Sequence, residues 1–188
     1  MEINSELFLF DRIWFSKVFK IARESGLDWL RMCAAAEVLS SGDTRARNID
    51  WLFIRNNLGL DSPIFATFYD VMENPTAEII DRGTRWGLFQ IYGEQAIQYG
   101  HTGKLVNLID ITKNVQVACR LLTQQIQASE MLAKIWGDQG EKERAENLIK
   151  SLPQAAEEAL GWPTKQIDEK VDELKKQMES LLTFGDLT

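Results

Sequence analysis

The longest helical pattern of the chain covers residues 111 to 136, with the sequence ITKNVQVACRLLTQQIQASEMLAKIW. Its apolar side chains recur every three or four residues, as they do along one face of an amphipathic helix. The residues of this face are Val115, Ala118, Leu121, Leu122, Ile126, Ser129, Leu132 and Trp136. Together with the shorter helical patterns around it, this stretch predicts a mainly α fold, with a small β element after residue 48.

Two helices are predicted at the start of the chain. Ser5 is a suitable N-cap for a helix that ends near Gly26, and Asp28 is a suitable N-cap for a second helix that ends at Ser41. Three aromatic residues widen the apolar surface of the first helix: Phe8, Phe15 and Phe19. These rings either pack deep inside the domain or form a face that binds a partner.

The segment from 43 to 85 has weaker signals. The sequence WLFI at 51–54 fits either a short strand or a helical turn, and we assign no boundaries there. After the longest helix, the pattern predicts a helix over 141–152 that stops at Pro153, and a shorter one over 154–160.

The end of the chain has the pattern of a coiled-coil seam. After the sequence GWPTKQ, which we interpret as a joint, apolar residues follow at alternating steps of four and three: Ile167, Val171, Leu174, Met178 and Leu181. We therefore divide the chain into a domain over 1–160 and a C-terminal amphipathic helix over 161–188. The seam is short, so the helix either packs on its own domain or supports an oligomer through 165–182 with help from other contacts.

Charge and composition exclude several kinds of site. A net charge of −7 argues against nucleic-acid binding, which needs clustered Lys and Arg. Cys33 and Cys119 lie in apolar helical patterns and are expected to be buried free thiols. Because His101 is the only histidine and no Gly-rich phosphate loop occurs, we expect neither a metal nor a cofactor.

Three motifs occur in an order that resembles a known family. They are LSSGDTRARN at 39–48, RWGLFQIYG at 85–93 and GHTGKLVNLIDITKNVQVACRLL at 100–122. The series is similar to the lytic transglycosylases and goose-type lysozymes, most closely to the versions carried by bacteriophages, and it covers about 28–150. The resemblance implies a lysozyme-like helical domain. It also implies an activity in which one glutamate protonates the glycosidic oxygen of peptidoglycan.

The family's catalytic glutamate falls on a leucine here. Measured from the family's serine (Ser40) and alanine (Ala46), its position is Leu39, which has no proton to donate. Leu39 is expected to point into a cleft beside the WGLFQIYG turn. Glu37 lies about 200° around the helix from Leu39 and should point elsewhere. Two further carboxylates precede that turn and are fallback candidates: Glu73 and Glu78.

The resemblance also assigns residues to the substrate cleft: Ser40, Gly87, Phe89, Gln90, Tyr92 and Asn147. In a working enzyme the side chains of the turn would line the glycan groove. The alternative is that the turn is kept as scaffold, with Gly87 allowing a tight bend. The tyrosine that the family carries in a later helix is replaced by Glu146. Together with Leu39, this second departure predicts a loss of catalysis.

We therefore expect a catalytically inactive, transglycosylase-like structural component of a phage tail, baseplate or related injection machine. Two alternatives stay open: an active peptidoglycan-cleaving enzyme with a displaced carboxylate, and a peptidoglycan-binding module. The apolar start of the chain is interrupted by charges and lacks a signal-peptide pattern. Accordingly, we expect synthesis in the cytoplasm and association with a virion, other virion proteins as partners, no nucleic acid and no membrane span.

Overall fold

The computed structural model describes residues 13–58 and 75–185. Its helices are α1 (Ile13–Glu24), α2 (Trp29–Ser40), α3 (Trp51–Asn57), α5 (Pro75–Arg82), α6 (Gly93–Gln98), α7 (Ile111–Asp138), α8 (Lys142–Lys150), α9 (Leu152–Ala159) and α10 (Thr164–Gly185), with a 3-10 helix η3 (Leu105–Ile109). Three short strands form an antiparallel sheet in the order β1-β2-β3: β1 (Arg47–Ile49), β2 (Thr84–Trp86) and β3 (Ile91–Tyr92). This confirms the predicted mainly α fold with a small β element.

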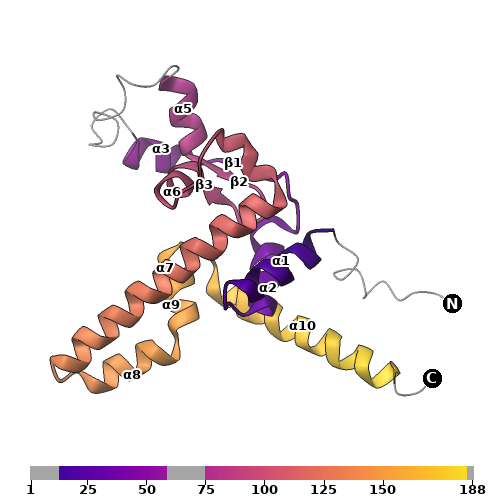
Figure 1. Cartoon of the computed structure of the whole chain (residues 1–188), viewed down its shortest axis with the longest axis vertical. Coiled ribbons are helices and arrows are strands. Elements are labelled where there is room, and N and C mark those ends of the chain that lie inside the picture. The colour runs from indigo at the N-terminus through magenta and orange to yellow at the C-terminus, as the bar shows by residue number, and fades with distance from the viewer. Residues whose placement is uncertain (1–12, 59–74, 186–188) are drawn as a thin grey trace.

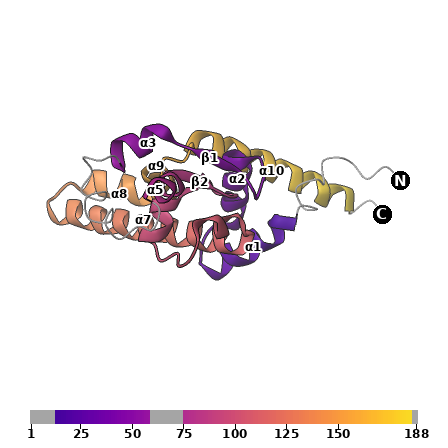
Figure 2. The same cartoon turned by 90° about the horizontal axis from the view of Figure 1, so that it is seen from above.

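The helices diverge from a common centre (Figures 1 and 2). The sheet, α3, α5 and α6 form one end, and α7 runs from this end along α9 to α8. On the other side, α2 packs between α1 and α10, and α1 also packs on α7. Within the described ranges, no helix has both the length and the apolarity to cross a bilayer.

Helix α2 lies at the centre of the core because small residues let its neighbours approach closely. All five residues from Met32 to Ala36 are buried. The predicted N-cap is confirmed: the carboxylate of Asp28 accepts hydrogen bonds from the backbone N–H groups of Leu30 and Arg31, at 2.9 and 3.2 Å. Ser41 ends the helix in the left-handed conformation, with φ of 53°.

The predicted apolar face of α7 is most completely buried in the first half of the helix. The four residues of that face from Val115 to Leu122 are buried, whereas Leu132 is 41% exposed. In the second half α7 contacts α8 and α9, and the small side chain of Ala133 is buried instead.

Residues Trp51 to Asn57 form a helix, which decides the ambiguity of WLFI. Pro153 lies in the first turn of α9, where its missing N–H costs little.

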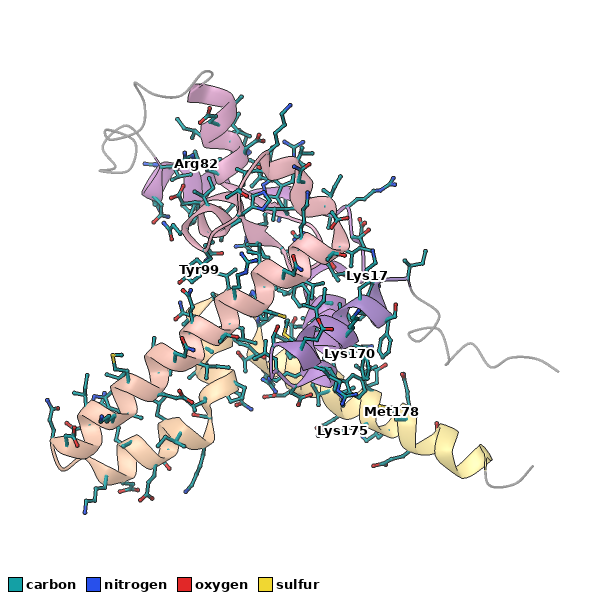
Figure 3. All side chains as sticks on the ribbon, in the orientation of Figure 1. Lys17, Arg82, Tyr99, Lys170, Lys175 and Met178 are labelled. Carbon is teal, nitrogen blue, oxygen red and sulfur yellow. The ribbon has the colours of Figure 1, made fainter. Side chains whose placement is uncertain are left out.

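Helix α10 packs on its own chain through the predicted seam. Ile167, Val171 and Leu174 are buried and belong to the same hydrophobic core as α2 and α7. Beyond them the helix projects past α2, and Met178 lies on this projecting part (Figure 3). Since three seam residues are already covered by the chain, they are not free to form an oligomer.

The aromatic residues of α1 also pack within the chain. Phe15 and Phe19 are half-buried, and both meet the ring of Trp29 edge-on, at centroid distances of 6.1 and 5.1 Å. Ser5 and Phe8 lie outside the described residues.

The predicted free thiols are confirmed, and burial raises the pKa of Cys33 to about 12 and that of Cys119 to about 11.

We expect Leu174→Ala to destabilise the whole domain, because α10 is part of its core. Truncating a buried leucine typically costs about 2–5 kcal/mol in the free energy of unfolding. Leu132→Ala makes the same chemical change at a side chain that is 41% exposed, and it should cost clearly less. Urea unfolding followed by circular dichroism measures both, and equal losses would contradict the packing of α10.

Candidate functional site

The WGLFQIYG turn is held by the start of α7. Asn114 is fully buried; its side-chain oxygen accepts from the N–H of Phe89 at 2.8 Å, and its amide donates to the carbonyl of Trp86 at 2.9 Å. Gly87 has φ of 64°, and a Cβ there would lie 2.4 Å from the carbonyl oxygen of Leu108. The two residues thus let the chain bend tightly between β2 and β3.

Three of the predicted cleft residues contact other parts of the chain through their side chains. Phe89 is fully buried and stacks on Trp162 with centroids 5.7 Å apart. The amide of Gln90 donates to the carbonyl of Gly87 at 2.8 Å, and the hydroxyl of Ser40 donates to the carbonyl of Ala36 at 3.0 Å. These contacts match the scaffold interpretation of the motif, in which the side chains hold the turn.

Tyr92 belongs to a polar cluster beside the sheet. Its hydroxyl donates to the carboxylate of Asp50 at 2.5 Å and accepts from Arg85 at 2.6 Å. Arg85 also bonds to Asp50 at 3.1 Å, and the ring of Phe53 stacks on Tyr92 at 4.1 Å. The hydrogen bond from Tyr92, with those from Phe53 and Arg85, lowers the pKa of Asp50, while burial and Asp50 raise the pKa of Tyr92. This arrangement favours an ionised carboxylate and a protonated phenol.

Leu39, where the resemblance places the catalytic acid, contributes to packing. Leu39 is half-buried and packs against the hydrophobic core. Glu37, two residues earlier on the same helix, is half-buried as well. Neither residue lines the two pockets beside η3 or the smaller pocket beside the start of α7. Glu73 lies outside the described residues.

Asn147 lies far from the turn. It is exposed on α8, as is Glu146, and α8 packs on α7 and α9. Helix α7 has 28 residues, so its two ends are about 40 Å apart. Asn114 lies near one end of α7 and α8 follows the other (Figure 1). The structure therefore does not bring Asn147 together with Gly87, Gln90 or Tyr92.

Two surface pockets flank η3 and share Val106. One has a volume of about 480 Å³ and contains Glu78, Asp81 and Arg82 from α5 on its wall. The other, of about 420 Å³, lies between the α2–β1 loop and the start of α7 and includes Arg45. Of the fallback carboxylates, Glu78 lines the first of these two pockets. No group of three or more metal-ligating side chains occurs within residues 13–58 and 75–185.

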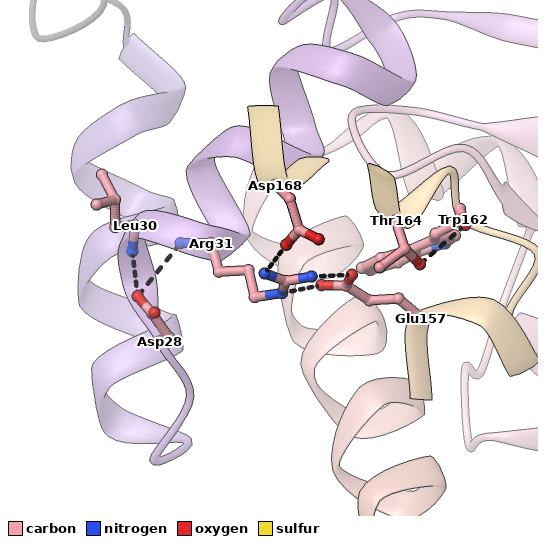
Figure 4. Close-up of polar contacts among 7 residues, drawn as sticks. All are labelled: Asp28, Leu30, Arg31, Glu157, Trp162, Thr164 and Asp168. Atoms are coloured by element: carbon pink, nitrogen blue, oxygen red, sulfur yellow. Dashed lines mark hydrogen bonds and ion pairs between the residues drawn. The ribbon is translucent and has the colours of Figure 1, made fainter. Parts of the chain in front are cut away.

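A largely buried group of ion pairs around Arg31 was not predicted (Figure 4). Arg31 of α2 donates two hydrogen bonds to the carboxylate of Glu157 in α9, at 2.6 and 2.7 Å, and a third to Asp168 of α10 at 2.6 Å. The side chain of Glu157 is 1% exposed. Burial raises the pKa of Glu157, and the bonds from Arg31 offset only part of that effect. For Arg31, burial acts to lower the pKa, but the bonds to both carboxylates raise it above its ordinary value.

No match was found when the chain was compared with protein-family models, with curated proteins and with solved structures.

Gly87→Ala should destabilise the fold because the turn leaves no room for an added methyl group. The added methyl group meets the carbonyl of Leu108 and the amide of Asn114, both closer than 3 Å. Gly26→Ala is a matched control because Gly26 also has a positive φ, 71°, but nothing lies within 4 Å of its Cβ position. Thermal unfolding should therefore show a larger fall in Tm for Gly87→Ala, and similar falls would mean that only backbone strain matters.

Tyr92→Phe should reduce stability in a pH-dependent way. A lowered pKa means that the folded state favours ionised Asp50, and the stability gained is present above the ordinary pKa of 3.8 and lost as the pH falls through the lowered value. The difference in unfolding free energy between wild type and Tyr92→Phe should thus be larger at pH 6 than well below pH 3.8. Urea titrations at several pH values measure it, and Asp50→Asn should remove the dependence. A difference that stays constant with pH would contradict the link to Asp50.

Proposed function

We propose that this chain is a transglycosylase-like structural component, without catalytic activity, of a phage tail, baseplate or related injection machine. The observation that carries the proposal is the state of its acidic groups. A general acid for glycoside cleavage needs both a raised pKa and access to the substrate. Glu157 has a raised pKa but is 1% exposed and bonded twice by Arg31, so it cannot reach a sugar.

The role of the retained motif supports the same proposal. Asn114 and Gly87 hold the turn, and Phe89 fills the core against Trp162. Each of these residues contributes to the fold whether position 39 carries an acid or a leucine. The family resemblance of these residues therefore supports a related fold without requiring the family's reaction.

Exposed apolar side chains support a role in assembly. In the second half of α7, Met131 is 67% exposed and Ile135 46%, and Ile149 on the adjacent α8 is 56% exposed. Apolar side chains gathered on a surface commonly mark contacts with other proteins. This hairpin forms one extremity of the molecule, opposite the projecting end of α10 (Figures 1 and 2), so it is well placed to reach a neighbouring subunit.

One observation favours the enzymatic alternative. Glu78 lies in a pocket of about 480 Å³, which is a common size for small-molecule sites, and Lys104 lines the same pocket. A displaced acid at this position would leave Leu39 without a role in the reaction. The two functions make opposite predictions for the action of the purified chain on peptidoglycan.

We expect no cleavage of purified peptidoglycan by the wild-type chain, because general acid–base assistance worth about 10²–10⁴-fold is missing at Leu39. Muropeptide analysis by mass spectrometry is the measurement, with a muramidase of known activity as positive control. Anhydro-muramyl products that disappear in Glu78→Gln or Glu37→Gln would establish the enzymatic alternative. Retention of the inactive chain by insoluble peptidoglycan would instead favour the binding-module alternative.

A further inference from the structure

A small pocket beside the start of α7 has only cationic and neutral side chains on its walls. It has a volume of about 150 Å³ and lies between α7 and the turn that follows Tyr99, which Figure 3 labels. The residues that matter for its chemistry are His101, Thr102, Lys113, Gln116 and Arg120. None of its lining residues carries a carboxylate, although the chain has a net charge of −7.

The spacing of the helical residues brings their side chains to one face. Lys113, Gln116 and Arg120 follow one another at steps of three and four residues along α7, so they form one stripe toward the turn. Arg120 reaches that turn: one of its terminal nitrogens lies 3.6 Å from the Cβ position of Gly100. On the other wall, the ring of His101 donates from Nε2 to the carbonyl of Lys104 at 3.3 Å, which holds the imidazole in place.

Arg120 differs from most of the other arginines in the described residues, which pair with carboxylates. Carboxylates within the described residues form ion pairs with Arg31, Arg47, Arg82, Arg85 and Arg144. Within the same part of the chain, no ion pair is formed by Lys113 or Arg120. Both side chains are exposed and line the same pocket, so an anion bound between them would reduce the repulsion between their like charges.

We propose that this pocket binds a phosphate-type oxyanion. The guanidinium of Arg120 offers paired donors that match such an anion, Lys113 adds a second charge, and Thr102 and Gln116 supply neutral donors. A volume of about 150 Å³ equals roughly five waters, which suits one tetrahedral group. Drug-sized ligands occupy pockets of about 300–1,000 Å³. The ligand is therefore inorganic phosphate or the terminal phosphoryl group of a larger molecule.

The single histidine makes the proposal directly measurable. Inorganic phosphate is titrated into the full chain at constant pH and constant ionic strength, balanced with sodium chloride, while the NMR signal of the His101 ring is followed. We expect a saturable shift of that signal. Arg120→Gln should weaken binding about tenfold or more, because a hydrogen bond to a charged group is lost. Lys134→Gln removes an exposed positive charge elsewhere on α7 and should leave the affinity unchanged.

Two further arms distinguish the source of the phosphoryl group and guard against misfolding. Sedimentation compares binding to vesicles of phosphatidic acid with binding to vesicles of phosphatidylcholine. Binding to phosphatidic acid alone that is lost in Arg120→Gln would identify the ligand as a lipid phosphomonoester. Binding to neither kind of vesicle would identify the ligand as a soluble anion. Amide spectra show whether each variant is folded. If Arg120→Gln does not fold, Arg120→Lys replaces it in the titration, because it keeps the positive charge but loses the paired donors of the guanidinium. A non-saturable shift, or equal titrations of wild type and a folded Arg120 variant, would overturn the proposal.

Discussion

The arrangement of helices α2, α9 and α10 depends on the ion pair between Arg31 and Glu157. Arg31 lies on α2, Glu157 on α9 and Asp168 on α10, so three helices that are far apart in sequence meet at one guanidinium. Removing one partner of a buried ion pair typically costs about 3–5 kcal/mol, because the other charge remains unpaired. An arrangement in which α9 or α10 leaves α2 would break these bonds. The pair stabilises a particular geometry more than it adds to total stability.

The contact has a consequence for the chemistry of the chain. A carboxylate that is almost fully buried would, without a partner, be a candidate acid with a raised pKa. Here the bidentate bonds from Arg31 occupy both oxygens of Glu157, and α10 covers the site with Asp168. The burial that produces an unusual pKa also removes the group from solvent. The raised pKa of Glu157 thus follows from its burial where α2, α9 and α10 meet.

Sequence patterns predicted those parts of the fold that depend on neighbours along the chain. The cap at Asp28 and the first half of α7 follow from local spacing, and both are confirmed. In the second half of α7, Leu132 of the predicted face is 41% exposed because the core ends before the helix does. A periodic pattern does not show where neighbouring helices stop. The role of Arg31 was missed for the same reason: its partners lie 126 and 137 residues away, and the arginine has no local signal.

The candidate cleft illustrates the same limit. Motif spacing along the chain identified Gly87 and Gln90 as members of one turn, and they do lie in one turn. It also placed Asn147 in the cleft, but that step needed knowledge of how α8 runs relative to α7, and α8 lies at the other end of α7. A turn that is held by Asn114 is needed for folding whether or not a substrate binds beside it. A resemblance carried by the residues of such a turn therefore bears on the fold before it bears on the reaction.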